Sequence, residues 1–340
     1  RRHVDAARAT LRVAALCHDI GHLPFSHAAE SLLPAGKNHE DVTIAWVYTP
    51  LMEQYWRQLP GLAARRIARA AAEADRFPDE PFSDWERILN EIITGDAFGV
   101  DRIDYLLRDS YHAGVAYGQF DHNRLIDNLR ILPSPVDRRT PVLGIMEGGL
   151  RSAEAMLLAR YFMYTQVYYH PVRVSYNLHL RDFLAAWLPG GLFPIEPEAH
   201  LAITDAEVLA ELARQARADS DTPIDERVTA WRIAARQHYK LVWDSTYARH
   251  DPDATEMVHR GLLDRFGAAA VHRDSKTASG GAIVDFPVRL RNGSVVSATS
   301  ISEILTHLPK PAYDYVFVRP DLVGDARSWV REQYPVIAND

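Results

Sequence analysis

The feature that most constrains this chain is the stretch 16–27, which reads Leu-Cys-His-Asp-Ile-Gly-His-Leu-Pro-Phe-Ser-His. It places three histidines and one carboxylate close together, beginning with the adjacent pair His18 and Asp19. The residues just before it are apolar and typical of a helix. Gly21 and Pro24 favour a helix end, because glycine often follows a helix and proline cannot continue its hydrogen bonds. The polar cluster is therefore expected where a buried helix ends.

A second acidic position, Asp101, begins another segment with helical periodicity. Imidazole nitrogen and carboxylate oxygen together suit a borderline or hard divalent cation. We therefore predict that His18, Asp19 and Asp101 bind a divalent metal ion, one of Mn, Fe, Mg, Zn, Ni or Co. Sites of this kind are built between the helices of a bundle. The alternative for these residues is a buried ion pair or a helix cap.

The composition is that of an ordinary globular protein, with 340 residues, 47% of them hydrophobic and 24% charged. The net charge of −7 argues against a general nucleic-acid-binding surface. Cys17 is the single cysteine, which excludes an internal disulfide and fits a reducing compartment. No signal peptide is visible, and no apolar run reaches the roughly 18 residues needed to span a bilayer. We expect a cytoplasmic protein with no membrane association.

The periodicity of apolar residues predicts a mainly α fold with a smaller C-terminal α+β lobe. Helices are expected at 3–17, 24–33, 39–47, 50–75, 83–95, 99–112, 121–128, 150–187 with a kink at Pro171, 204–216, 225–238 and 322–333. Strands are expected at 141–146, in a hairpin over 283–298 around Asn292-Gly293, and near 313–318. Residues 244–270 resemble a small β–α or helical insert. A linker rich in proline and glycine at 189–197 divides the chain into a catalytic core, 1–188, whose first part is expected to be all-helical, and a C-terminal lobe, 189–340.

Four further residues near the first cluster are candidates for proton transfer. His22 and His27 are suited to protonate a leaving oxygen near neutral pH. Glu30 and His39 could form a pair in which the carboxylate orients the imidazole. The alternative for each histidine is a capping or packing role at a helix start.

Cations and aromatic residues farther along could bind a nucleotide. Arg102, Arg108 and Arg160 could hold phosphate oxygens, although surface arginines are common. Tyr164, Tyr168 and Tyr169 lie on the long expected helix, where tyrosines at helical spacing are more often part of the core.

Three motifs in order resemble those of the HD-domain phosphohydrolases. They are residues 16–27, the stretch 100–115 that begins Val-Asp-Arg-Ile-Asp-Tyr, and the stretch 160–170 that begins Arg-Tyr-Phe-Met. The match is closest to the branch of deoxynucleoside triphosphate (dNTP) triphosphohydrolases, and it extends over roughly residues 10–185. Order and spacing agree across this range, and the likeness weakens beyond it.

The resemblance implies an all-α HD-domain core with a metal bound by His18, Asp19 and Asp101. It also implies a further histidine ligand some tens of residues earlier. His3 is too close to His18 to serve, so this ligand is expected before Arg1.

The resemblance also implies roles for the neighbouring side chains in hydrolysis. His22, and His39 with Glu30, match residues that serve the hydrolytic step, and His27 matches one near the α-phosphate. Glu30 stands where aspartate is more usual, which lengthens the reach of the carboxylate. Arg102 stands where lysine is familiar, so it keeps the charge but changes the geometry of phosphate binding.

The resemblance also implies which residues bind the substrate. Tyr105, Asp109 and His112 fall on positions that line the sugar and phosphate pocket in the family. Arg160 matches a phosphate-binding arginine, and Tyr168 matches a tyrosine under the sugar and base. Tyr169 replaces a glutamine found in some members.

The expected function is hydrolysis of dNTP to deoxynucleoside and triphosphate by a metal-dependent enzyme. Members of this branch are often oligomeric, so a homo-oligomer of two or more copies is expected. Two alternatives remain. One is an HD-type phosphodiesterase or nucleotidase acting on another nucleotide or a short oligonucleotide, and the other is a nucleotide-sensing regulator with weak catalysis.

Overall fold

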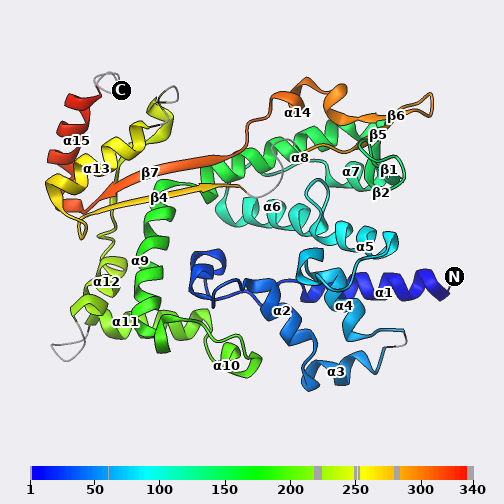
Figure 1. Cartoon of the computed structure of the whole chain (residues 1–340), viewed down its shortest axis with the longest axis horizontal. Helices are drawn as coiled ribbons and strands as arrows, with labels where there is room; N and C mark the ends of the chain where they lie inside the picture. Colours follow the sequence, from blue (N-terminus) through cyan, green and yellow to red (C-terminus); the bar gives the residue numbers. More distant parts are fainter. Residues whose placement is uncertain are drawn as a thin grey trace.

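The computed structural model describes residues 2–59, 61–217, 224–248, 251, 253–278 and 284–334. Most of this chain is helical, which confirms the predicted fold class (Figure 1). The α-helices are α1 (Arg2–Cys17), α2 (His39–Val47), α3 (Pro50–Trp56), α4 (Ala64–Ala71), α5 (Asp84–Thr94), α6 (Val100–Ala113), α7 (His122–Asn128), α8 (Leu150–Met163), α9 (Pro171–Trp187), α10 (Pro197–Leu201), α11 (Asp205–Arg217), α12 (Ile224–Ala234), α13 (Ala254–Phe266), α14 (Glu303–His307) and α15 (Val323–Gln333). No helix in these ranges is long and apolar enough to cross a membrane.

Two small sheets accompany the helices. The strands are β1 (Leu129–Pro133), β2 (Pro141–Met146), β3 (Lys240–Asp244), β4 (Val271–Thr277), β5 (Pro287–Arg289), β6 (Val295–Ser297) and β7 (Ala312–Val318). One sheet has the order β1-β2-β5-β6, in which only the β2–β5 pair is parallel. The other has the order β3-β7-β4 and is antiparallel. Because β2 pairs with β5, strands from both sides of residue 188 share a sheet, and the division at that residue stays a prediction.

Several expected elements are confirmed in detail. Helix α5 begins after Ser83, whose hydroxyl accepts from the Glu86 amide while the Glu86 carboxylate accepts from the Ser83 amide. β5 and β6 form the expected hairpin around Asn292-Gly293, but only Gly293 has positive φ, 87°, so the turn is a longer loop and not the two-residue type I′ turn that Asn-Gly favours. Residue 283, where the hairpin was expected to begin, lies outside the described residues.

Other expectations were wrong for identifiable reasons. The helix expected at 24–33 is instead two short 3₁₀ turns, because Phe25 and Ser26 adopt positive φ and interrupt any α-helix there. The helix expected over 50–75 is divided into α3 and α4, with Gly61 at a φ of 83° between them. The first part is not all-helical, since it contributes the β1–β2 hairpin. The short strands β1, β3 and β4 were not predicted.

The long helix expected at 150–187 is present in three parts. Helix α8 passes into a wider π-helical turn at Tyr164–Tyr168, and α9 begins afresh at Pro171. Single π turns within helices often occur at functional sites. Here the turn sets the direction of Tyr164 and Tyr168.

The last turns of helix α1 bury one face against apolar residues of α4 and α5. Ala14 and Cys17 are almost fully buried in one cluster with Ile67, Ala68 and Ile93. The chain then turns, with the Ile20 amide donating to the Cys17 carbonyl and the His22 amide donating to the Asp19 carbonyl. The first histidine motif is thereby held at the junction of α1 with α2 and α6.

A buried arginine fixes α4 to α5 and to the loop between them. Arg69 is 1% exposed, and its Nε donates to Glu86 Oε1 at 2.9 Å. Its Nη1 donates to the carbonyl and the carboxylate of Glu80, and its Nη2 donates to the Pro81 carbonyl. The guanidinium carbon lies 3.8 Å from the centre of the Phe82 ring. We call Arg69, Glu80 and Glu86 the arginine brace.

Candidate active site

His18, Asp19 and Asp101 meet where the end of α1 faces the first turn of α6. His18 Nε2 lies 3.1 Å from Asp101 Oδ1 and 3.4 Å from Asp19 Oδ2. One ligand atom from each of the three residues lies within 4.8 Å of the others, as a shared ion requires. The structure therefore brings together the three residues predicted as metal ligands, and we call them the metal-ligand group.

The environment of His18 suits a cation. His18 Nδ1 lies 2.8 Å from the Ala15 carbonyl, which can only accept, so the proton of the neutral ring sits on Nδ1. Nε2 is buried, and the atoms that face it are carboxylate oxygens of Asp101 and Asp19. Burial disfavours the imidazolium, but the hydrogen bond to Asp101 and the charge of Asp19 outweigh it and raise the pKa of His18 to about 9. The same carboxylates that attract a proton here would attract a divalent ion, so the residues present fit a metal.

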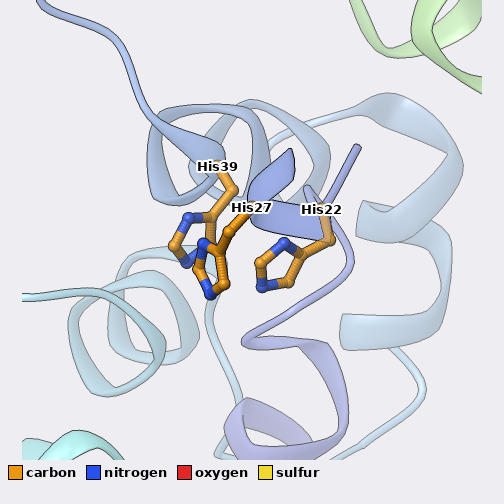
Figure 2. Close-up of side chains that lie close together, drawn as sticks. All are labelled: His22, His27 and His39. Atoms are coloured by element: carbon orange, nitrogen blue, oxygen red, sulfur yellow. The ribbon is translucent and has the colours of Figure 1, made fainter. Parts of the chain in front are cut away.

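A second group gathers beside the first. The rings of His22, His27 and His39 form a compact histidine cluster, which Figure 2 shows. The rings of His22 and His39 are stacked with centroids 4.1 Å apart, and the ring of His27 meets both edge-on. His22 and His27 belong to residues 22–27, the histidine loop, whereas His39 is the first residue of α2.

Glu30 connects two of these rings. Its Oε2 lies 3.0 Å from His27 Nδ1 and its Oε1 lies 2.6 Å from His39 Nδ1. The hydrogen bonds from His27 and His39 hold the pKa of the Glu30 carboxyl well below its usual range. An ionised Glu30 keeps a proton on each Nδ1 and leaves Nε2 of each ring as the atom that can exchange a proton. The predicted Glu30–His39 pair is thus present, and His27 joins it.

The metal-ligand group and the histidine cluster are in contact. His22 Nε2 lies 3.4 Å from Asp19 Oδ1. Burial opposes ionisation of Asp19, but the hydrogen bond to His22 and the charge of His18 outweigh it and lower the pKa of that carboxyl. Asp19 therefore stays ionised between the metal-ligand group and the histidine cluster.

Two residues that support this turn were not recognised from the sequence as part of the site. Thr43 Oγ1, fully buried on α2, donates to the His18 carbonyl at 2.8 Å and accepts from the Gly21 amide at 3.0 Å. A Cβ atom on Gly21 would lie 2.2 Å from the His39 carbonyl oxygen, so only glycine fits there. A glycine within a histidine motif was a signal for this close approach, whereas nothing local to Thr43 indicated its role.

One face of α6 extends the site away from the metal-ligand group. Asp101, Tyr105 and Asp109 are spaced four residues apart and share this face over about 12 Å. At its far end the Tyr168 hydroxyl donates to Asp109 Oδ2 at 2.6 Å. Burial and this bond to Asp109 raise the pKa of Tyr168. The ring centroids of Tyr105 and Tyr168 lie 6.1 Å apart.

The remaining predicted residues are placed less uniformly. Arg160 is buried, with its guanidinium carbon 5.4 Å from the centre of the Tyr164 ring. Arg102 donates to the Gly95 carbonyl and pairs with Asp96, so it braces the start of α6. His112 is exposed near the end of α6 and contacts the ring of Tyr111.

Comparisons with known proteins bear on this arrangement. Residues 120–305, more than half of the chain, match the family described as the HD associated region. An uncharacterized protein of Bacillus subtilis, YwfO, is 32% identical over 182 residues, which are 53% of this chain and 37% of that protein. A deoxynucleoside triphosphate triphosphohydrolase SAMHD1 homolog of Dictyostelium discoideum is 27% identical over 177 residues, which are 51% of this chain and 32% of that protein. The chain thus spans about a third of the length of these relatives.

Solved structures agree with these relationships. A hypothetical protein from Aquifex aeolicus is 31% identical, with a TM-score of 0.77 over 94% of this chain and 79% of that one. A phosphohydrolase from Bacteroides thetaiotaomicron shares the fold, with a TM-score of 0.67 at 22% identity over 93% of this chain and 80% of that one. The matched region, the structural relative that aligns with 94% of this chain and the histidine–aspartate motif lead to one conclusion. The chain belongs to the HD-domain superfamily.

Proposed function

We propose that this chain carries the active site of a hydrolase that converts dNTP to deoxynucleoside and triphosphate. The observation that carries the proposal is the order of groups along α6. The metal-ligand group and the histidine cluster lie at its beginning, and Tyr105 and the Asp109–Tyr168 pair lie farther along. An extended nucleotide lying on this face would place its phosphates against the histidines and its sugar against the tyrosines.

The metal-ligand group would hold a divalent ion, which supplies positive charge against phosphate oxygens and acidifies a water molecule. His18 Nε2, Asp19 and Asp101 provide nitrogen and oxygen ligands for it. A buried imidazole nitrogen that faces two carboxylates supports this assignment.

The histidine cluster would deliver the proton that the leaving 5′-oxygen requires. His27 and His39 keep Nδ1 protonated against Glu30 and present Nε2 outward for proton transfer. His22 is fixed between Asp19 and the ring of His39. Water would attack the α-phosphorus as the bond from that phosphorus to the 5′-oxygen breaks, and the 5′-oxygen would take the proton, so that an intact deoxynucleoside and triphosphate are released.

The sugar and phosphates would be held by residues of α6, α8 and the π turn. Asp109 and the Tyr168 hydroxyl form a polar pair suited to a sugar hydroxyl, and the ring of Tyr105 closes the same side. Arg160, and Arg102 if it leaves its contacts with Gly95 and Asp96, would supply positive charge for the phosphates. The relative from Dictyostelium, which is named a deoxynucleoside triphosphate triphosphohydrolase homolog, supports this substrate class.

The test is to incubate full-length protein with each dNTP and Mn²⁺ and to separate the products by ion-exchange chromatography. We expect equal amounts of triphosphate and deoxynucleoside. Formation of dNDP, or no turnover with any dNTP, would overturn the proposal. Parallel reactions with ribonucleotides and dinucleotides separate it from a phosphodiesterase or nucleotidase activity.

A further inference from the structure

The histidine loop has a strained main chain. Phe25 has a φ of 59° and Ser26 a φ of 57°, in the left-handed region that side chains other than glycine rarely adopt. Such conformations persist only where the surroundings hold them. The position of His22 and His27 therefore depends on what grips this loop.

Two residues distant in the sequence contact main-chain atoms of the histidine loop. His200 is 6% exposed, and its Nε2 lies 3.2 Å from the His22 carbonyl oxygen. Its Nδ1 faces the Pro194 carbonyl oxygen at 3.3 Å. The Phe25 amide, at the first strained residue, donates to Asp205 Oδ1 at 2.8 Å. His200 lies in α10 and Asp205 begins α11, both in the predicted C-terminal lobe.

Apolar side chains of α11 and of Phe193 also pack against the histidine loop. Leu23, which is 4% exposed, belongs to one buried cluster with Phe193, Val208 and Leu212. The Phe193 amide also donates to the Leu32 carbonyl at 2.9 Å, just after the loop. The hydrogen bonds from His200 and to Asp205 are therefore made within a packed contact.

We propose that His200 and Asp205 are positioning residues that hold the histidine loop in its left-handed turn. They touch the main chain at His22, three residues before the left-handed turn, and at Phe25, its first residue, and they leave the imidazoles free to face the metal-ligand group. Through them the C-terminal lobe sets the geometry of the histidine cluster. The catalytic meaning of this contact rests on the proposed function.

Two substitutions of His200 separate its contacts with the His22 and Pro194 carbonyls, of which a neutral imidazole, with one N–H, can donate to only one at a time. In His200→Gln the side-chain amide reaches about as far as Nε2 and can still donate to the His22 carbonyl. In His200→Asn it reaches only as far as Nδ1 and serves the Pro194 carbonyl instead. We expect His200→Asn to lower kcat about ten- to a hundredfold at unchanged KM, since a misplacement of about 1 Å can cost that much, and His200→Gln to stay within about threefold. Equal activities of the two variants would overturn the proposal.

A readout that needs no turnover is hydrogen exchange at the Phe25 amide in the full-length protein. Asp205→Ala removes the acceptor and should speed exchange at this amide about tenfold or more, whereas Asp205→Asn keeps an acceptor and should leave it slow. Slow exchange in both variants would contradict the positioning role of Asp205. So would a faster exchange that spreads over the whole protein together with a lower Tm. If wild-type protein hydrolyses no dNTP, the proposed function fails, but the exchange experiment still tests whether Asp205 holds the histidine loop.

Discussion

The metal-ligand group and the arginine brace are both clusters of opposite charges at helix junctions, but they differ in the side chain at their centre. In the brace, Arg69 has carboxylate or carbonyl partners for Nε, Nη1 and Nη2. In the metal-ligand group, the buried His18 Nε2 faces carboxylate oxygens of Asp101 and Asp19 at 3.1 and 3.4 Å. A guanidinium has no lone pair to offer a metal, so the brace can only stabilise the fold, whereas an imidazole nitrogen between carboxylates can exchange its proton for a cation.

The strongest way to break this comparison is Asp101→Asn, which keeps the shape of the side chain and removes its charge. We expect hydrolysis to fall by about 10²–10³-fold, because the charge stabilisation that a metal supplies is worth several kcal/mol. Bound Mn²⁺, measured by equilibrium dialysis, should fall as well. Asp104→Asn is the matched control, since Asp104 is exposed on the same helix and pairs with Arg108. Equal losses of hydrolysis and of bound Mn²⁺ in Asp101→Asn and Asp104→Asn would show that Asp101 has no special role in binding a metal.

The converse test is Arg69→Leu, which should damage stability and leave chemistry intact. Removing Arg69 leaves the carboxylates of Glu80 and Glu86 without this buried partner. We therefore expect the free energy of unfolding to fall by about 3 kcal/mol. Urea titration measures this, with exposed Arg57→Leu as the control. The rate per folded molecule should stay near that of wild type. A loss of Mn²⁺ binding in folded Arg69→Leu protein would show that the brace also supports the metal site.

Glu30→Gln asks whether the histidine cluster belongs to the chemistry of the metal-ligand group. Glutamine keeps the size of the side chain but cannot hold a proton on both His27 and His39. We expect kcat to fall about 10- to 100-fold with bound Mn²⁺ unchanged, as for other residues that orient a catalytic imidazole. Glu53→Gln on α3 is the control, because Glu53 pairs only with Arg57 in the structure described. Loss of bound Mn²⁺ in Glu30→Gln would place Glu30 in the metal site instead.

The smallest expected effect concerns acid stability of the brace. The hydrogen bond from Arg69 lowers the pKa of Glu86 to about 2. Because this pKa is lower in the folded state, the stabilisation is present above the unfolded glutamate pKa, about 4.5, and is lost as the pH falls toward 2. Allowing for solvent screening, we expect about 1 kcal/mol. In urea titrations, wild type and Glu86→Gln should differ at pH 7 and converge in this range. A constant difference would contradict the assignment.

The amino-acid sequence indicated the local chemistry and missed the distant contacts. His18, Asp19 and Asp101 could be paired because their motifs each carry their own helical periodicity and resemble those of one family. The break at Phe25 and Ser26 could not be predicted, because neither residue favours positive φ and their conformation depends on contacts elsewhere. His200 and Asp205 gave no signal, since each acts on main-chain atoms far away in the sequence. Strand β4 was missed because its sequence, Val-His-Arg-Asp-Ser-Lys-Thr, lacks a clear apolar alternation.

The central claim is that a metal-ligand group and a histidine cluster together hydrolyse a dNTP at its α-phosphorus. The most direct measurement is a reaction of Mn²⁺-loaded full-length protein with dNTP in water labelled with heavy oxygen, followed by mass spectrometry of both products. The account predicts that the label enters triphosphate and not deoxynucleoside, and that Asp101→Asn forms neither product at a comparable rate. Label in the deoxynucleoside, or equal triphosphate release by Asp101→Asn, would contradict it.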